Sequence, residues 1–197
     1  MRQAKYRPNV QPRLERSSLE AQALWTYQRV SRRITSPPDA NILSMDMTWV
    51  TDRIAVGGGI WNDENMEELV QRGVTHIINM QIEFDDRPLA EPYPVRVLNN
   101  PTDDDFMPKP PALFQAGVDF ALEALDQPKS KIYIHCAAGV HRAPMMTLAI
   151  MRVLGWSLQD AKNLIQELRY VVDFAECYVE SVENFMKVYE SANTNPR

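Results

Sequence analysis

The strongest constraint on the fold is an apolar strand that passes through a short loop into an apolar helix. The strand pattern covers residues 131–135, and residues 143–154 are apolar nearly all round a helix. A helix without a polar face is stable only when it is buried on every side. The strand, the loop and the helix therefore belong to one core, and 197 residues are enough to build that core in a single domain.

Further strand patterns precede this core. Residues 47–56 suggest two short strands split at Thr51 and Asp52, and residues 74–80 and 95–98 suggest two more. The triplet from Gly57 to Gly59 follows the first pair and lacks the spacing of a phosphate-binding loop, so we expect a plain turn there.

Helical patterns lie between and after these strands. They cover residues 65–72, closed by Gly73, and residues 108–125. Ser157 and Asp160 form a capping box for a later helix. The last helix carries four large side chains on one face: Tyr178, Val182, Phe185 and Tyr189. This alternation predicts an α/β fold, in which helices flank a compact and mainly parallel sheet.

The first residues differ from the rest in charge and pattern. Residues 1–35 contain eight Lys or Arg against two Glu, and a capping box at Ser17 and Glu20 predicts a helix to about Ile34. The basic side chains are interleaved with apolar ones, which favours a solvated helix face over a nucleic-acid or lipid contact. We therefore expect an N-terminal helical extension over residues 1–45, a main domain over residues 46–192 and a tail over residues 193–197.

The composition indicates a soluble cytoplasmic protein. The longest apolar stretch is too short to span a bilayer and is interrupted by Arg152, and the polar first residues lack a signal-peptide pattern. Cys136 and Cys177 are too few for a secreted disulfide scaffold. We expect no nucleic-acid partner and no membrane span, and nothing in the sequence fixes the oligomeric state.

The loop after the strand at residues 131–135 has the chemistry of an anion site. Cys136 lies at the carboxyl edge of the predicted sheet, where α/β proteins bind ligands. The small residues Ala137, Ala138 and Gly139 allow the backbone to curl, so that successive N–H groups surround an anion at a helix N-terminus. Such a site favours the thiolate form of cysteine. Arg142 adds a planar fork that can grip two phosphate oxygens.

The segment from His135 to Arg142 matches the pattern His-Cys-x-x-Gly-x-x-Arg, the signature of protein tyrosine phosphatases. The chain resembles their dual-specificity branch over about residues 48–189, including the segments 50–57 and 73–79. The resemblance implies that Cys136 attacks phosphorus to form a phosphocysteine, and that Arg142 and the amides of residues 137–142, including Val140 and His141, hold the phosphate oxygens. It also implies that no metal or other cofactor is needed, and that His135 orients the loop by hydrogen bonding.

The same resemblance implies a general acid on the loop that precedes the helix at residues 108–125. This loop offers Asp103, Asp104 and Asp105, and the family spacing of roughly thirty residues favours Asp104, at 136 − 104 = 32 positions, with Asp105 next. The remaining acids would only solvate the loop. His141 either adds a pH-sensitive charge near the phosphate or points to solvent.

One residue departs from the family pattern. Ala143 stands where a Ser or Thr hydroxyl usually assists hydrolysis of the phosphocysteine, which predicts slow breakdown of that intermediate. In its Arg-Ala-Pro sequence the chain resembles phosphatases of regenerating liver and plant glucan phosphatases, which carry the same three residues. We therefore expect a phosphorylated protein as substrate, carrying phosphotyrosine, phosphoserine or phosphothreonine, and a phosphorylated glucan or small molecule as the alternative.

Two other classes of protein fit part of the pattern. A rhodanese-like sulfurtransferase also places a cysteine in an anion-binding loop, but it would not need the acids upstream. A catalytically silent phosphate-binding module would keep the loop, and Ala143 leaves that interpretation open.

Overall fold

The computed structural model describes residues 45–194. The chain divides into two units, residues 1–44 and 45–197, and the description below concerns the second. The predicted N-terminal helix and nearly all of the predicted extension lie outside the described residues, as does the end of the predicted tail. Among residues 45–194, no helix combines the length and the apolar character needed to cross a membrane.

The secondary structure alternates between strands and helices in chain order. The elements are β1 (Met47–Trp49), β2 (Ile54–Gly57), α2 (Asp63–Gln71), β3 (His76–Asn79), α3 (Arg87–Ala90), β4 (Arg96–Asn99), α4 (Pro111–Leu125), β5 (Ile132–His135), α5 (Arg142–Val153), α6 (Leu158–Leu168) and α7 (Glu176–Thr194). The strands and helices predicted after residue 46 are all present, with boundaries shifted by up to three residues. Helix α3 was not predicted, because a single four-residue turn is too short to show periodicity.

The five strands form one sheet in the order β1-β2-β5-β3-β4, in which only β1 is antiparallel to its neighbour. The predicted mainly parallel α/β sheet is therefore confirmed. In the register of the parallel strands, Gly57 of β2 lies opposite His135 of β5, and His135 lies opposite Asn79 of β3. These three strands end together, so the loops that follow them meet at one edge of the sheet.

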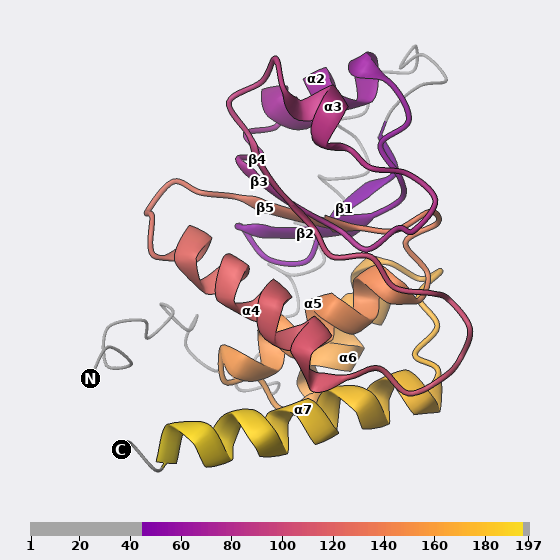
Figure 1. The fold of residues 1–197 in the computed structure, drawn as a ribbon, viewed down its shortest axis with the longest axis vertical. Coiled ribbons are helices and arrows are strands. Elements are labelled where there is room, and N and C mark those ends of the chain that lie inside the picture. The colour runs from indigo at the N-terminus through magenta and orange to yellow at the C-terminus, as the bar shows by residue number, and fades with distance from the viewer. Residues whose placement is uncertain (1–44, 195–197) are drawn as a thin grey trace, which may run out of the picture. The chain divides into compact units, whose positions relative to one another are not determined.

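Helices cover both faces of the sheet (Figure 1). Helices α2 and α3 lie on one face, and α4, α5, α6 and α7 lie on the other. Helix α5 is at the centre of the larger layer, since its residues from Arg142 to Met151 are all buried. Gly117 of α4 permits close packing there, because a Cβ atom would lie 2.4 Å from the sulfur of Met146. The predicted burial of α5 is confirmed.

The predicted capping box of α6 is also present. Ser157 Oγ accepts a hydrogen bond from the Asp160 amide at 3.0 Å. In α7, Tyr178, Val182 and Phe185 are buried against the core, and Tyr189 packs beside them. Helix α7 runs to Thr194, two residues into the segment predicted as a tail.

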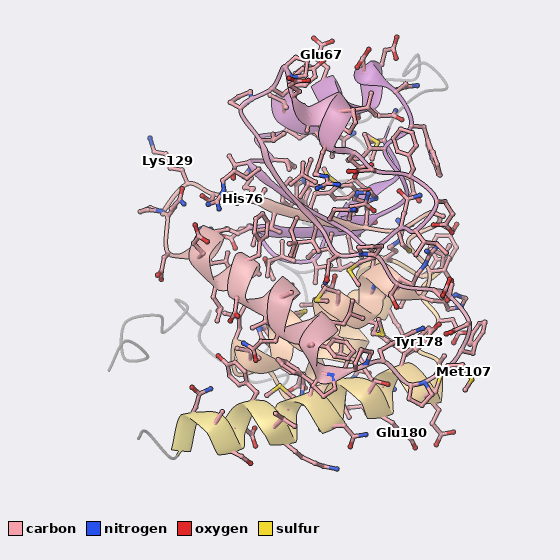
Figure 2. The ribbon with its side chains drawn as sticks, in the orientation of Figure 1. Glu67, His76, Met107, Lys129, Tyr178 and Glu180 are labelled. Atoms are coloured by element: carbon pink, nitrogen blue, oxygen red, sulfur yellow. The ribbon has the colours of Figure 1, made fainter. Side chains whose placement is uncertain are left out.

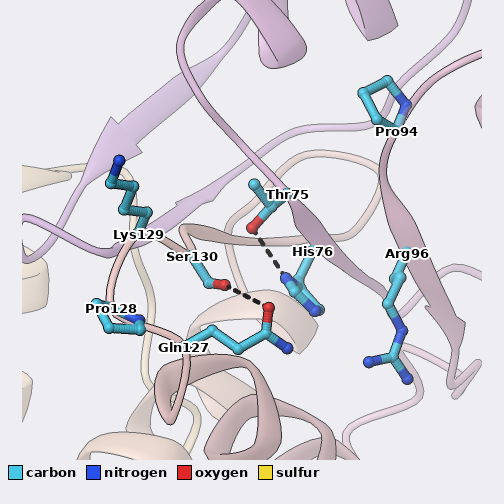
Figure 3. Close-up of a pocket in the computed structure, with 8 residues that line it drawn as sticks. All are labelled: Thr75, His76, Pro94, Arg96, Gln127, Pro128, Lys129 and Ser130. Carbon is cyan, nitrogen blue, oxygen red and sulfur yellow. Dashed lines mark hydrogen bonds between the residues drawn. The ribbon is translucent and has the colours of Figure 1, made fainter.

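A pocket of ≈ 530 Å³ opens at the opposite edge of the sheet, where β3 and β4 begin (Figure 3). Its lining includes His76, whose Nδ1 lies 2.9 Å from Thr75 Oγ1, together with Arg96 and Lys129. Figure 2 places His76 and Lys129 on the side of the molecule away from Tyr178 and Met107. The pocket is therefore separate from the loop between β5 and α5.

Candidate active site

The loop between β5 and α5, residues 136–141, has its carbonyl groups tied to the surrounding protein. Ala137 O accepts from the Gly59 amide at 3.1 Å, and Val140 O accepts from the Asp173 amide at 3.1 Å. The carbonyls of Ala138 and Gly139 accept from the Arg169 guanidinium at 3.0 and 2.9 Å. The C=O and N–H of a trans peptide unit point in opposite directions, so these four contacts turn four successive N–H groups toward the other side.

The amides of residues 137–141 donate no hydrogen bond to any group within residues 45–194. A run of successive backbone N–H groups that point to one side without a protein partner forms a concave site suited to an anion. The loop leads into α5, whose N-terminus adds a partial positive charge. The geometry of the loop therefore fits an anion nest.

Two glycine positions allow this loop to form. Gly139 has φ +63°, and a Cβ atom there would lie 2.5 Å from the Gly57 carbonyl carbon and oxygen. Gly57 in turn lies so close to the Asp46 carbonyl that a Cβ atom would be 1.9 Å from its oxygen. The glycine triplet is thus more than the plain turn that its sequence suggested, because it lets the end of β2 lie directly against the loop.

Arg169 holds the loop from behind. Its side chain is 5% exposed, and its guanidinium binds both carboxylate oxygens of Asp46 at 2.6 and 2.7 Å in addition to the two loop carbonyls. Burial lowers the pKa of Arg169, but the hydrogen bonds and charge of Asp46 outweigh that effect and raise it overall. The guanidinium therefore stays charged and supports the loop at two carbonyls.

Cys136 and Arg142, the predicted nucleophile and phosphate clamp, lie at the two ends of this loop. Cys136 is buried at 2% exposure, and its amide donates to Gly57 O at 3.4 Å. Arg142 Nη1 and Nη2 each donate to one oxygen of Glu83 at 2.9 Å, and Nη1 also donates to Thr102 O. Arg142 Nε is buried without a hydrogen-bond partner in the described part of the chain.

The charge of Arg142 is secured by its neighbours. Burial lowers the pKa of Arg142, but the hydrogen bonds that it donates to Glu83 and the charges of Cys136, Glu83 and Asp104 raise it above its ordinary value. The same contact lowers the pKa of Glu83. Glu83 thus holds the guanidinium in place through Nη1 and Nη2, and the N–H of Nε stays available to a ligand.

The three candidate acids differ sharply in their surroundings. Asp104 Oδ2 lies 3.1 Å from His141 Nδ1 and 3.8 Å from Arg142 Nε. Asp105 instead pairs with Lys109 Nζ at 2.5 Å, and this contact lowers the pKa of Asp105. Asp103 is exposed and makes no side-chain contact recorded within residues 45–194. Asp104 is therefore the carboxyl group that the structure brings to the loop.

Tyr178 of α7 fixes the position of Asp104. Its hydroxyl donates to Asp104 Oδ1 at 3.1 Å and accepts from the Phe106 amide at 3.0 Å. Burial, together with the neighbouring carboxylate of Asp104, raises the pKa of Tyr178 to about 12. Phe106 adopts φ +57°, unusual for a residue other than glycine, and its ring stacks on Tyr178 and meets His141 edge to face.

The two histidines of the signature make different contacts. His135 is fully buried, and its Nε2 lies 2.5 Å from Asp86 Oδ2, so its hydrogen bond goes to the segment before α3 and not to the loop itself. His141 is 20% exposed and lies between Asp104 and Asp173. His141 therefore contacts the candidate acid and does not simply point to solvent, and its pH-sensitive charge near a phosphate stays a prediction.

Several residues at the site were not predicted from the sequence: Asp46, Glu83, Asp86, Phe106, Arg169 and Tyr178. The sequence gives no signal for Asp86 or Arg169. They stand out only in the structure, as charged residues that are buried. No group of three or more His, Cys, Asp or Glu among the described residues is arranged to hold a metal ion.

Comparison with known families agrees with this geometry. Residues 60–187 match the family described as dual specificity phosphatase, catalytic domain. The chain belongs to this family. The match covers more than half of the chain and includes the loop, the acid segment and most of α7, so the predicted dual-specificity branch is confirmed.

Two curated members of the dual specificity phosphatase family show how far the likeness extends. Protein phosphatase Slingshot homolog 2 of Homo sapiens is 25% identical over 184 residues, which are 91% of this chain and 12% of that protein. Dual specificity protein phosphatase 26 of Rattus norvegicus is 32% identical over 111 residues, which are 55% of this chain and 53% of that protein. The chain thus spans only part of each relative's length.

Solved structures share the fold of the dual specificity phosphatase domain. The crystal structure of PTPMT1 in complex with PI(5)P has a TM-score of 0.66 at 21% identity and covers 75% of this chain and 99% of that one. The human tyrosine phosphatase-like serine/threonine/tyrosine-interacting protein has a TM-score of 0.60 at 21% identity, covering 73% of this chain and 97% of that one. At these identities the likeness concerns the fold alone.

Proposed function

We propose that this protein hydrolyses phosphate monoesters through a phosphocysteine intermediate. The observation that carries the proposal is the convergence of three groups on the loop: the Cys136 thiol, the unpaired amides of residues 137–141, and the Arg142 guanidinium. The amides and Arg142 suit a tetrahedral dianion, and Cys136 lies at the base of the loop that would hold it. Family membership supports the same chemistry, whereas the sulfurtransferase alternative gains no support from it.

In the first step, the Cys136 thiolate attacks phosphorus and the bond from phosphorus to the ester oxygen breaks. The leaving oxygen needs a proton, which Asp104 supplies from the position fixed by Tyr178 and His141. The loop amides and Arg142 stabilise the charge on the three remaining oxygens. Because Asp105 is held by Lys109, its carboxyl group is less available for this role.

In the second step, water attacks the phosphocysteine, the sulfur–phosphorus bond breaks and inorganic phosphate leaves. Asp104, now deprotonated, takes a proton from the attacking water. Ala143 is buried at the start of α5 and offers no hydroxyl to assist the departing thiolate. We therefore propose that this second step is slower than the first.

The proposed substrate is a phosphorylated protein. Residues 45–194 contain 12 Lys or Arg and 23 Asp or Glu, a balance of 12 − 23 = −11, which disfavours highly charged head groups. PTPMT1, whose structure holds a phosphoinositide, shares the fold, so a phosphorylated lipid is the competing substrate class. A phosphorylated glucan is supported only by the Arg-Ala-Pro sequence.

Two further proposals concern location and domain limits. Cys136 and Cys177 are both free thiols, which suits a reducing compartment and supports a cytoplasmic location. The phosphatase domain is proposed to cover residues 46–192, preceded by a separate helical extension.

Hydrolysis of para-nitrophenyl phosphate in the presence of a chelator tests the proposed function. We expect turnover by the wild type and none by Cys136→Ser. On an alkyl phosphate, whose leaving oxygen needs the proton, Asp104→Asn should lower kcat/KM by about 10²- to 10⁴-fold, the usual contribution of a general acid or base, and the loss on para-nitrophenyl phosphate should be smaller. Arg142→Lys should raise KM and lower kcat, because lysine lacks the bidentate fork.

The matched controls are Asp103→Asn and Asp105→Asn, which remove the same charge on the same loop. Their kcat should stay close to that of the wild type. Activity that survives Cys136→Ser would exclude the phosphocysteine route, and a loss of the alkaline limb of the pH profile in Asp105→Asn alone would transfer the acid role to Asp105. A wild type without any turnover would favour a phosphate-binding module.

A further inference from the structure

Exposed large apolar side chains are concentrated around the catalytic loop. Within the described residues, eight such side chains are exposed, and seven of them lie at positions 61, 82, 84, 106, 107, 170 and 171. We call these seven side chains the apolar rim. The eighth, Val188, lies on α7, ten residues or about 15 Å along the helix from Tyr178.

The rim comes from four segments, and each of them contacts the loop or Arg142. Trp61 follows Gly59, whose amide binds Ala137 O, and the Trp61 ring lies 6.2 Å from the Phe84 ring. Ile82 and Phe84 flank Glu83, which binds Arg142. These two segments therefore place three large side chains beside the phosphate clamp.

The other two segments lie beside His141 and Val140. Phe106 contacts the His141 ring, and Met107 next to it is 59% exposed and projects outward in Figure 2. Tyr170 and Val171 follow Arg169, which binds the loop carbonyls, and Tyr170 is 90% exposed. Side chains from four segments thus converge around one loop.

The same segments carry acidic charge. They contain Glu83 and Asp173, which are 47% and 70% exposed, and the three acids at 103–105. The basic residues of these segments, Arg169 and Lys109, are buried and paired with Asp46 and Asp105. A side of the protein that inserts into a bilayer typically combines aromatic residues with Lys and Arg, and the rim has the opposite charge.

We infer that the apolar rim is a docking surface for the polypeptide that carries the phosphorylated residue, and that it selects apolar and basic side chains next to that residue. The inference rests on the proposed function and deepens it by naming the surface that binds the substrate and the side chains that this surface selects. Apolar side chains of the substrate would cover the rim, and basic side chains would face the exposed carboxylates of Asp103 and Asp173. Single exposed apolar side chains are common on protein surfaces, whereas a group of them at one place usually marks an interaction site.

Two phosphotyrosine peptides of equal length test the inference. One carries Leu and Phe beside the phosphotyrosine and Arg further out, and the other carries Ser and Glu at the same places. We expect the wild type to favour the first peptide by about tenfold or more in kcat/KM, since covering one large apolar side chain is worth roughly that factor. Para-nitrophenyl phosphate reports the chemistry without the flanking residues.

The double variant Met107→Ser with Tyr170→Ser tests the rim itself. Both side chains are well exposed, so the substitutions leave the core intact. The preference for the first peptide should fall to about threefold or less, as the rim loses two of its contacts. Val188→Ser, which removes an apolar side chain of similar exposure away from the loop, should keep the full preference.

A membrane substrate is tested in parallel with phosphatidylcholine vesicles that contain a phosphatidylinositol monophosphate. A higher kcat/KM on these vesicles than on either peptide would overturn the inference in favour of a lipid surface. Equal rates on the two peptides, or a double variant that keeps the full preference, would overturn it while leaving the proposed function in place. Failure to hydrolyse any substrate, para-nitrophenyl phosphate included, would reject the proposed function and the inference with it.

Discussion

Replacing Arg169 by methionine tests whether the shape of the catalytic loop depends on support from behind. Methionine keeps much of the side-chain length but removes every hydrogen bond to Ala138 O, Gly139 O and Asp46. The Gly139 carbonyl then loses its donor in a buried place and the Ala138 carbonyl in a partly buried one, whereas Asp46 is 61% exposed and can be hydrated. The loss should therefore fall mainly on the loop.

The size of the effect follows from these contacts. Hydrogen bonds to a charged partner contribute roughly 1.5–3 kcal/mol each, so two carbonyls correspond to about 3–6 kcal/mol. The exposed ion pair adds only about 0–1 kcal/mol. At roughly 2–4 °C per kcal/mol for a domain of this size, Tm should fall by about 6–24 °C.

Stability alone does not show that the loop has changed, so the assay also measures phosphate affinity. The inhibition constant of inorganic phosphate against para-nitrophenyl phosphate should rise by about tenfold, which corresponds to one weakened charge-assisted hydrogen bond from the loop. Arg152→Met is the matched control. Arg152 binds Trp156 O and Glu183 within the helical layer, so its loss should lower Tm without changing the inhibition constant.

The reasoning would be refuted by an Arg169→Met protein that loses stability as expected but binds phosphate and turns over substrate within about twofold of the wild type. Such a result would mean that the glycine contacts and the Val140–Asp173 hydrogen bond are enough to hold the loop.

Three further predictions concern other parts of the molecule. Tyr178→Phe frees Asp104 from one hydrogen bond, so kcat/KM should fall by about tenfold for an alkyl phosphate and much less for para-nitrophenyl phosphate, which needs little acid assistance in the first step; equal losses would argue against a positioning role. Ala143→Ser should raise steady-state turnover and shrink the pre-steady-state burst, and an unchanged rate with no burst in either protein would contradict slow phosphocysteine breakdown. Burial lowers the pKa of His76, so the unfolded chain takes up its proton first. Stability should therefore decline as pH falls below 6.5, and His76→Gln, followed by thermal melts, should show a smaller decline than the wild type.

The fold was largely predictable because its elements carry strong periodic signals. Helix α5 is apolar on all sides, and β3 and β5 are short apolar runs bounded by polar residues. Cys136 and Arg142 could be proposed as nucleophile and clamp for a similar reason, because they lie in one short segment where all the requirements of an anion loop are local.

The supporting residues were not predictable, because their partners are distant in sequence. Glu83 lies 59 residues before Arg142, and Arg169 lies 123 residues after Asp46. The choice among the three acids also depends on tertiary contacts, since Asp104 and Asp105 are neighbours that face different partners. No local pattern distinguishes them.

The contact between Glu83 and Arg142 has a consequence for the thermodynamics of phosphate binding. A free arginine side chain loses about 2 kcal/mol of rotamer entropy when it is immobilised. Here the carboxylate holds both terminal nitrogens of Arg142 at 2.9 Å within the folded protein. That entropy is lost when the chain folds and not when the phosphate arrives. In its proposed role as phosphate clamp, Arg142 would therefore bind phosphate without a further large loss of rotamer entropy. The favourable enthalpy of binding would then be offset less by ordering of the side chain.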